Sequence, residues 1–339
     1  MNTSGDPTAA EALQHPNCGC IYVAYGFVYW MYAVHSALTL RATNQALRAV
    51  LVTNLDLPNP VIDGQPLFER LIHHRAEDGA NRVDKLSVDL LSPFEKTVYL
   101  DCDTEIWADL SPMFRLLDNY DMALRQLNVV TTKQYEILPG LTAHQAGFAE
   151  WNAGVIFFRK TRTTHAVFSR WREIFLDEGM KKDQPSFARA VLAHPELRLL
   201  PMSPAWNIKP TPAYEVDWID LRSGDIRILH YRKPFTMPSV AMGINRSFEL
   251  VYGSIRAGAE KCEDGIERFR HQYRALSIYL RWFDSPAGRR LLHNNEHLAL
   301  LPLRMWLRLR AFFGFSPYLK FGRIQSENGA NFRRETREG

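Results

Sequence analysis

The segment from Thr97 to Asp103 reads Thr-Val-Tyr-Leu-Asp-Cys-Asp and joins a short apolar run directly to two aspartates. An apolar run of this kind is typical of a buried strand. Asp101 and Asp103 stand two residues apart, so in an extended chain their carboxylates project to the same side. Like charges held that close are unfavourable unless a cation neutralises them, and Mg²⁺ or Mn²⁺ prefers carboxylate oxygens. Taken alone, however, the pair fits an exposed turn better, because aspartate is common in turns.

Outward from this segment, apolar runs and helical patterns alternate along the chain. Strands are predicted at 20–25, 49–53, 97–100, 121–124, 151–159 and 226–229. Helices are predicted at about 27–42, 85–91, 111–117, 164–176 and 185–192, the third with Ser111 as its cap and Pro112 at its first position. This alternation favours an α/β domain with a mostly parallel, mixed sheet covered by helices on both faces. Ligands of such sheets bind at the carboxyl ends of the strands, where Asp101 and Asp103 are expected.

The composition is that of an ordinary soluble globular protein, with 339 residues, 46% apolar and 23% charged. A net charge of +4 is too weakly basic to indicate nucleic acid binding, but it suits anionic partners such as nucleotides. The four cysteines, Cys18, Cys20, Cys102 and Cys262, are too few for a disulfide framework. No second ligand pair accompanies Cys18 and Cys20, so small buried thiols in a reducing compartment are expected rather than a zinc site.

The sequence predicts a cytoplasmic protein without a membrane span. Residues 1–17 are polar and lack the features of a secretory signal. The apolar stretch 21–40 is interrupted by Gly26 and His35, and it fits a strand followed by a helix. The predicted division is a disordered start over 1–17, a main catalytic domain over 18–258, a helical region over 259–326 and a disordered tail over 327–339.

Two segments outside the expected sheet carry functional expectations. The stretch 126–150 lacks clear periodicity and is long enough to be a functional flap. The segment 302–315 mixes arginines with large aromatic residues. It fits a helix lying peripherally on a membrane, and it fits equally a last helix whose arginine stems cover the core.

Further residues follow in a characteristic order. Lys85 precedes the aspartates, Trp151-Asn-Ala-Gly-Val155 comes after them, Asp183-Gln184 stands at a helix start, and His230-Tyr-Arg-Lys-Pro234 follows a strand. Over roughly residues 20–235 this ordered set resembles the glycogenin-like family 8 of retaining glycosyltransferases, including its bacterial members that build lipopolysaccharide outer cores. The sequence departs from the family in its last motif, where the usual glycine is absent and the lysine lies closer to the histidine.

The resemblance implies a GT-A, Rossmann-like fold and the transfer of a sugar from a nucleotide-diphosphate donor, a UDP-sugar, to a glycan or glycolipid with retention of configuration. It implies that Asp101, Asp103 and His230 bind Mn²⁺ or Mg²⁺, and that Asp183 and Gln184 face the anomeric carbon as catalytic residues. The donor-binding residues that it implies are Ala24, Tyr25, Lys85, Asp101, Asn152, Ala153, Gly154 and Lys233, with Arg232 as an alternative to the last. The basic tails of bacterial members also favour peripheral contact with the inner face of the membrane.

The chemistry of these residues is coherent without the family. A nucleotide diphosphate is a poor leaving group until its charge is neutralised, and a cation on two carboxylates and an imidazole would do so. Lysine would add positive charge, and asparagine and aspartate would orient sugar hydroxyls. Each residue also has an ordinary explanation: Lys85 as a solvated helix charge, Asn152 as a turn, Asp183 as a helix cap and His230 as a structural histidine.

Two other functions compete with sugar transfer. A sugar-phosphate nucleotidylyltransferase shares the sheet architecture, but it opens with a glycine-rich loop after the first strand, where this chain has only Gly26. A non-catalytic carbohydrate- or nucleotide-binding protein of the same fold would not need the complete set of aspartates, asparagine and histidine. Both alternatives therefore explain the sequence less fully than a glycosyltransferase does.

Overall fold

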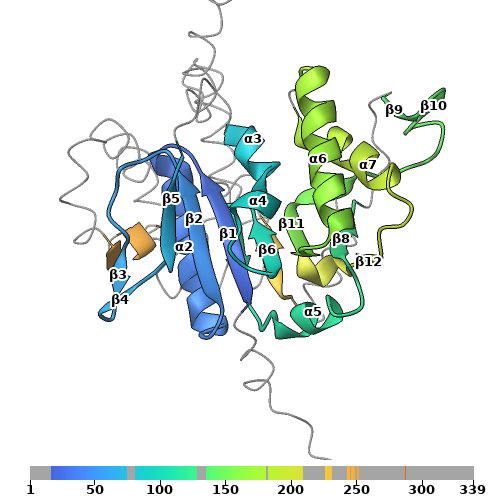
Figure 1. Cartoon of the computed structure of the whole chain (residues 1–339). Helices are drawn as coiled ribbons and strands as arrows, with labels where there is room; N and C mark the ends of the chain where they lie inside the picture. The colour runs from blue at the N-terminus through green and yellow to red at the C-terminus, as the bar shows by residue number, and fades with distance from the viewer. Residues whose placement is uncertain are drawn as a thin grey trace, which may run out of the picture.

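The structure, a computed structural model, describes residues 17–74, 81–127, 135–180, 182–208, 226–230, 243–244, 246–248, 250–251 and 287. The helices within these ranges are α2 (Phe27–Thr43), α3 (Asn81–Lys85), α4 (Val88–Leu91), α5 (Ser111–Leu116), α6 (Arg162–Asp177), α7 (Asp183–Leu192) and the 3₁₀ turn η1 (Pro204–Trp206). The strands are β1 (Cys18–Ala24), β2 (Arg48–Thr53), β3 (Val61–Ile62), β4 (Gln65–Pro66), β5 (Arg70–His73), β6 (Lys96–Leu100), β7 (Thr104–Ile106), β8 (Met122–Gln126), β9 (Glu136–Leu138), β10 (Leu141–Thr142), β11 (Trp151–Arg159), β12 (Leu199–Pro201) and β13 (Ile228–His230). Figure 1 shows their arrangement.

A seven-stranded sheet in the order β12-β8-β11-β6-β1-β2-β5 forms the centre of the molecule (Figure 1). Every neighbouring pair is parallel except the two that involve β11, which runs antiparallel to both β6 and β8. The predicted mostly parallel, mixed sheet is therefore confirmed. The reversal of β11 has a functional consequence, because it brings the first residues of β11 to the edge where the other strands end.

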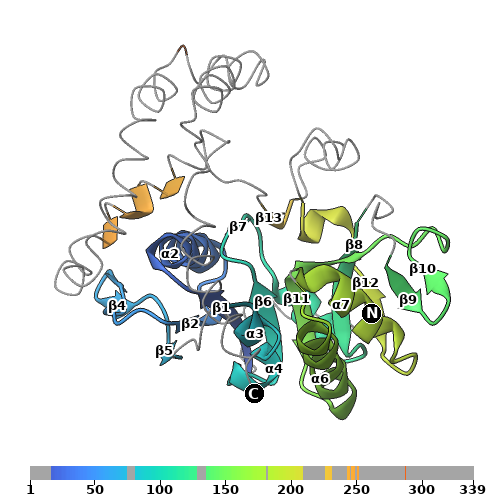
Figure 2. The same ribbon diagram turned by 90° about the horizontal axis from the view of Figure 1, so that it is seen from above.

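Helices cover both faces of this sheet, as predicted. Figure 2 shows α2 on one face and α3, α4, α6 and α7 on the other. Val98 and Leu100 of β6 pack in the apolar cluster that contains α2, and Tyr99 between them packs in the cluster that contains α6 and α7. Burial on both faces explains why the strand sequences are continuously apolar instead of alternating. The described cysteines, Cys18, Cys20 and Cys102, are buried free thiols, as the sequence predicts.

Several local predictions need correction. The helix expected at 85–91 is two short helices, because Leu86 and Ser87 turn between α3 and α4 and the Ser87 hydroxyl donates to the carbonyl of Val83. Helix α5 begins at Ser111 itself, preceded by Leu110, so Ser111 is not the cap. The Ser111 backbone N–H and hydroxyl instead donate to the carboxylate of Asp109. A carboxylate is a stronger hydrogen-bond acceptor than a neutral hydroxyl oxygen.

Short elements account for the remaining differences. Strands β5 and β12 at the two sheet edges and β7 outside the sheet were not predicted, because three or four residues carry little periodic signal. The strand predicted at 226–229 is present as β13, shifted to Ile228–His230 and paired with β7. In the stretch 126–150, the described part contains the small hairpin β9–β10.

Most predictions for the two ends of the chain concern residues that the structure does not describe. The predicted disordered ends 1–17 and 327–339, the helical region 259–326 and the segment 302–315 lie outside the described residues, apart from Asn17 and Ala287. Membrane contact by 302–315 therefore stays a prediction. In the part of the chain that the structure describes, no helix is long and apolar enough to cross a membrane.

We expect Asp121→Asn to destabilise the fold. The buried Asp121 carboxylate accepts hydrogen bonds from Arg198 at 2.8 Å and from Arg159 at 3.1 Å. The hydrogen bonds from Arg198 lower the pKa of Asp121, an effect that its burial opposes and that Arg159 reinforces. Losing the buried charge opposite Arg159 should cost about 2 kcal/mol of unfolding free energy at pH 7, measured by urea denaturation.

The difference in unfolding free energy between the parent and Asp121→Asn should disappear at acid pH. Because folding lowers the pKa of Asp121 below its ordinary value of 3.8, the stabilisation is present above that pH and disappears as the pH falls through the folded pKa. The difference between parent and variant should accordingly shrink below about pH 4. The matched control is Glu173→Gln, whose carboxylate pairs with Arg170 where both side chains are exposed, and it should change stability by less than about 0.5 kcal/mol. Equal losses in the two variants would contradict the assignment.

Candidate active site

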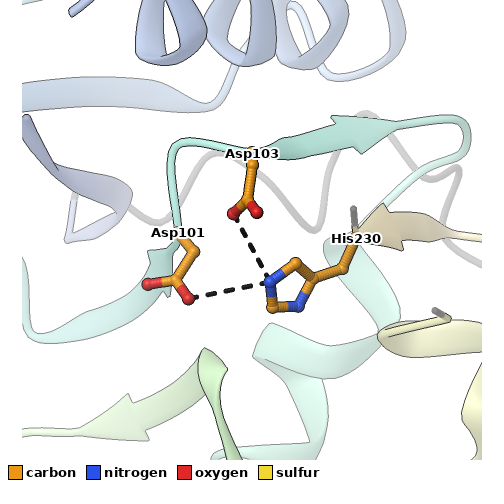
Figure 3. A group of neighbouring side chains, drawn as sticks. All are labelled: Asp101, Asp103 and His230. Carbon is orange, nitrogen blue, oxygen red and sulfur yellow. Dashed lines mark ion pairs between the residues drawn. The ribbon is translucent and has the colours of Figure 1, made fainter. Parts of the chain in front are cut away.

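Asp101, Asp103 and His230 converge in space, as Figure 3 shows. Nε2 of His230 lies 3.4 Å from Oδ1 of Asp103 and 3.6 Å from Oδ2 of Asp101. One ligand atom from each residue can be chosen so that all lie within 4.8 Å of one another. His230 is buried, whereas both carboxylates are partly exposed. The three residues thus form a cluster with one buried and two partly exposed candidate ligands.

The backbone explains how a histidine so far along the chain reaches the aspartates. Strand β6 ends at Leu100, and β7 begins at Thr104, so Asp101 and Asp103 occupy the short bend between them. Strand β13 pairs with β7 in antiparallel register, with His230 opposite Thr104. Position 230 is thereby set beside Asp103 by backbone hydrogen bonding, while Asp101 is fixed by its N–H, which donates to the carbonyl of Gly154 at 2.7 Å.

The spacing of the cluster fits a divalent cation. Direct charge-assisted hydrogen bonds from the imidazole to the carboxylates would be about 2.7–2.9 Å long. An octahedral ion with ligand bonds of about 2.1 Å instead holds neighbouring ligand atoms roughly 3 Å or more apart. The glycine at position 154 is also needed here, because a Cβ at that position would lie 2.1 Å from Cε1 of His230 and 2.6 Å from Oδ2 of Asp101. The donor set and the close backbone approach both suit Mn²⁺ or Mg²⁺.

Lys85 connects this cluster to helix α7. Its ammonium lies 3.1 Å from Oδ1 of Asp101 and 2.6 Å from Oδ2 of Asp183, and the side chain is only 11% exposed. Burial by itself would lower the pKa of Lys85, but the two carboxylates raise it above its ordinary value. Burial correspondingly opposes ionisation of Asp101, yet Lys85 and then His230 lower its pKa. Lys85 is therefore a buried, permanently charged bridge and not a solvated helix charge.

Two neighbours hold this bridge in place. The hydroxyl of Tyr99, on β6, donates to Oδ1 of Asp101 at 2.5 Å, and the Lys85 ammonium lies 5.3 Å from the centre of the Tyr99 ring. Asp183 is the first residue of α7, preceded by Lys182, so its carboxylate is not the helix cap that the ordinary explanation required. Its carbonyl instead accepts a hydrogen bond from the indole of Trp171, which anchors the start of α7 to α6.

The start of β11 supplies the next predicted residues. Asn152 is fully buried, and its Oδ1 accepts a hydrogen bond from the N–H of Gly154 at 2.8 Å. Its Nδ2 is buried without a hydrogen-bond partner among the described residues. Such an orphaned donor is costly unless a ligand satisfies it. Ala153 differs from these two, because it packs in the apolar cluster with α6 and α7.

The other predicted donor residues lie near this edge or outside the described chain. Ala24 is the last residue of β1, the parallel neighbour of β6, and Tyr25 follows it, so both lie at the same edge of the sheet as Asp101. Both are buried, and the Tyr25 hydroxyl has no hydrogen-bond partner among the described residues. Lys233 and Arg232 are outside the described residues, and their contacts with a donor stay predictions.

Gln184 contacts a carboxylate that sequence reasoning did not single out. Its Nε2 donates to Oε2 of Glu150 at 3.1 Å, and Glu150 is a buried residue directly before β11. Burial and then the nearby Glu150 raise the pKa of Tyr135, from the segment leading into the hairpin β9–β10. The stretch 126–150 thus reaches the residues that the sequence assigned to the reaction. A single glutamate before a tryptophan carries no signal by which it could have been found.

Asn207 is the second residue that was missed. It follows the 3₁₀ turn η1, is fully buried, and lies 2.8 Å through its Oδ1 from Nδ1 of His230. No motif surrounds Asn207 in the sequence, and its connection to the site depends entirely on the fold. It is the partner of the histidine that would complete the metal site.

The mixed seven-stranded sheet and its flanking helices form an α/β fold of the GT-A type, and comparison with solved structures agrees with it. The bifunctional glycosyltransferase WbbM, in its apo form, superimposes with a TM-score of 0.50 at 15% identity over 72% of this chain and 52% of that one. The galactosyltransferase LgtC, in complex with donor and acceptor sugar analogues, gives 0.47 at 17% identity over 70% of this chain and 96% of that one. GlyE of Streptococcus pneumoniae TIGR4 gives 0.42 at 14% identity, covering 64% and 54%.

These similarities concern the fold. No protein-family profile matches the chain, and no curated protein sequence matches it either. The chain therefore shares the GT-A fold with the glycosyltransferase WbbM, whereas membership of family 8 stays a prediction.

Proposed function

We propose that the protein is a metal-dependent glycosyltransferase that uses a nucleotide-diphosphate sugar, a UDP-sugar, as its donor. The observation that supports this most directly is the convergence of Asp101, Asp103 and His230 at the carboxyl edge of a GT-A sheet. Two segments that are far apart in the sequence, the bend between β6 and β7 and the end of β13, bring these ligands together with a spacing that suits a divalent cation. A protein that only packed its core would have no reason to place two carboxylates and a buried imidazole together there.

The proposed roles of the residues follow from their contacts. Asp101, Asp103 and His230 would hold Mn²⁺ or Mg²⁺, which when bound neutralises the charge of the leaving diphosphate. Asn152 presents its orphaned amide N–H groups to a hydroxyl of the donor sugar. Lys85 keeps the Asp183 carboxylate oriented, so that Asp183 can accept a hydrogen bond from a second sugar hydroxyl. Gln184, held by Glu150, lies beside this position and contacts the reacting end of the sugar.

The carboxyl edge of the sheet would also hold the rest of the donor site and the acceptor. We expect Ala24, Tyr25 and Gly154 to line the donor site and Lys233 to contact the donor, whereas Ala153, whose side chain packs in the core, would contribute only its backbone. The acceptor is a glycan or glycolipid that approaches between α7 and the hairpin β9–β10, and the reaction retains the configuration at the anomeric carbon. The lack of a glycine-rich loop between β1 and α2 disfavours a nucleotidylyltransferase, because α2 begins at Phe27 directly after Gly26.

Calorimetric titration with UDP tests this proposal. We expect UDP to bind at least about tenfold more tightly with Mn²⁺ than with a chelator present, because the ion would contact the diphosphate. A panel of UDP-sugars should then reveal one donor that is hydrolysed slowly in the absence of acceptor and only when metal is present. An affinity for UDP that is the same with and without Mn²⁺, or an absence of UDP binding, would contradict the proposal and favour a non-catalytic binding protein.

A further inference from the structure

The two ring nitrogens of His230 face opposite sides of the imidazole and have different partners. Nε2 points at the carboxylates of Asp101 and Asp103, at 3.6 and 3.4 Å. Nδ1 lies 2.8 Å from Oδ1 of Asn207, on the far side of the ring, and both residues are buried. A neutral imidazole has one N–H donor and one lone-pair acceptor, so the partner of Nδ1 determines what Nε2 can do.

An amide oxygen can only accept a hydrogen bond. With Oδ1 of Asn207 facing it, Nδ1 of His230 must carry the proton, and Nε2 is left with the lone pair that a metal ion requires. The opposite orientation of the amide would place an NH₂ group against Nδ1. That would force the proton onto Nε2 and aim an N–H, which cannot bind a cation, at the two aspartates.

The backbone of Asn207 is held firmly relative to His230. The Asn207 N–H donates to the carbonyl of Pro204 at 2.9 Å, and the Asn207 carbonyl accepts a hydrogen bond from the guanidinium of the buried Arg125 on β8. The next residue, Ile208, bridges to β13: its N–H donates to Ile228, and its carbonyl accepts from the N–H of His230 at 2.7 Å. Positions 207 and 230 are therefore joined by a bridge of backbone hydrogen bonds.

The remaining amide nitrogen of Asn207 is a further clue. Nδ2 is buried and has no hydrogen-bond partner among the described residues. A buried donor without a partner costs about 1–3 kcal/mol, so packing and stability alone favour an apolar side chain at this position. A polar residue at position 207 is explained if the Asn207 side-chain oxygen is needed to accept a hydrogen bond from the imidazole of His230.

We infer that Asn207 is the positioning residue of the metal site, fixing His230 as the Nδ1–H tautomer with Nε2 free for a divalent cation. The inference rests on the proposed function in one respect, which is that a divalent cation binds to Asp101, Asp103 and His230. Asn207 is fully buried on the far side of the imidazole from the carboxylates, so it would act through His230. Removal of such an outer hydrogen-bond partner typically weakens metal binding about 10- to 100-fold.

Two substitutions at the same position separate this role from packing. Asn207→Asp retains an oxygen acceptor for Nδ1–H, whereas Asn207→Leu keeps a similar volume without an acceptor. We expect calorimetric titration of the full chain with Mn²⁺ alone to show about 10- to 100-fold weaker binding for the leucine variant. The aspartate variant should stay within about threefold of the parent or bind more tightly, since carboxylate–histidine–metal arrangements are common. Thermal unfolding without metal establishes that both variants are folded.

A second measurement depends neither on the substitutions at position 207 nor on enzymatic activity. Two-bond ¹H–¹⁵N correlation spectra of histidine-labelled protein distinguish the tautomers, and a His230→Gln sample identifies the resonances of His230 among the eleven histidines. We expect the Nδ1–H form in the metal-free parent. An Nε2–H form, or parental Mn²⁺ affinity in the leucine variant, would overturn the inference. If the parent bound no Mn²⁺ at all, the proposed function would fail instead, whatever the tautomer.

Discussion

Asp103→Asn is expected to abolish the response of the protein to divalent metal while leaving its fold intact. Asp103 is one of the two carboxylates facing His230, and its side chain is partly exposed. Unlike Asp101, it takes no part in the bridge to Lys85 and Tyr99. An amide oxygen is a far weaker ligand than a carboxylate, and the loss of metal chemistry at the leaving group should lower transfer about 10³-fold.

The stability of this variant should change in the opposite direction to its activity. Without metal, Asp101 and Asp103 repel each other, so removing one charge should leave the melting temperature unchanged or slightly higher. Added Mn²⁺ should raise the melting temperature of the parent, because a ligand that binds only the folded state stabilises it, and should not raise that of the variant. Differential scanning calorimetry with and without Mn²⁺ measures both effects.

The control for Asp103→Asn is Asp118→Asn, the same change at an exposed surface carboxylate. It should keep both the metal-dependent increase in melting temperature and the transferase activity. A variant at position 103 that retained parental Mn²⁺ stabilisation would show that the ion, if bound, lies elsewhere. A large fall in metal-free stability would indicate a structural role that the partly exposed side chain does not suggest.

The sequence predicts the parts of this site that lie next to long apolar strands. The run Thr97–Leu100 before Asp101 indicates a strand end without any partner being known, because burial on both faces leaves a continuous apolar pattern. The apolar run after Asn152 does the same for β11. That this strand runs in reverse, and so starts where β6 ends, is a matter of pairing between distant segments that no local pattern encodes.

Other parts of the site depend on contacts that local sequence does not specify. The apolar pattern predicts a strand before His230, but it does not show that this strand pairs with β7, and only the family resemblance pointed to His230 as a metal ligand. Lys85 has the sequence context of an ordinary surface lysine, and only the fold shows it buried between Asp101 and Asp183. Asn207 and Glu150 carry no motif, because their roles consist of single hydrogen bonds to residues far along the chain.

Gly154→Ala should disrupt the same site by sterics alone. The backbone at Gly154 is not in the left-handed region, so alanine introduces no backbone strain there. The added methyl group would instead lie 2.1 Å from Cε1 of His230 and 2.6 Å from Oδ2 of Asp101, distances that real Cβ atoms essentially never show. His230 is buried and tied to Asn207, so it has little room to retreat.

We therefore expect Gly154→Ala to lose about 2 kcal/mol of unfolding free energy through overpacking, measured by urea denaturation without metal. Displacement of the imidazole and of the Asp101 carboxylate should also lower Mn²⁺ affinity at least about 100-fold, because a cation site tolerates little change in ligand geometry. A methyl group is small, and the effect would be out of proportion to its size unless it meets the metal ligands themselves.

A double-mutant cycle with His230→Ala identifies the group that the methyl meets. Without the imidazole, the methyl of Gly154→Ala would occupy part of the space that the ring leaves, so most of its destabilisation should disappear in the double variant. Mn²⁺ affinity should not return, because the histidine ligand is gone. Restored stability without restored metal binding would locate the conflict at the ring. If Gly154→Ala were equally destabilising in both backgrounds, the close approach of β11 to His230 could not be the reason that glycine occupies position 154.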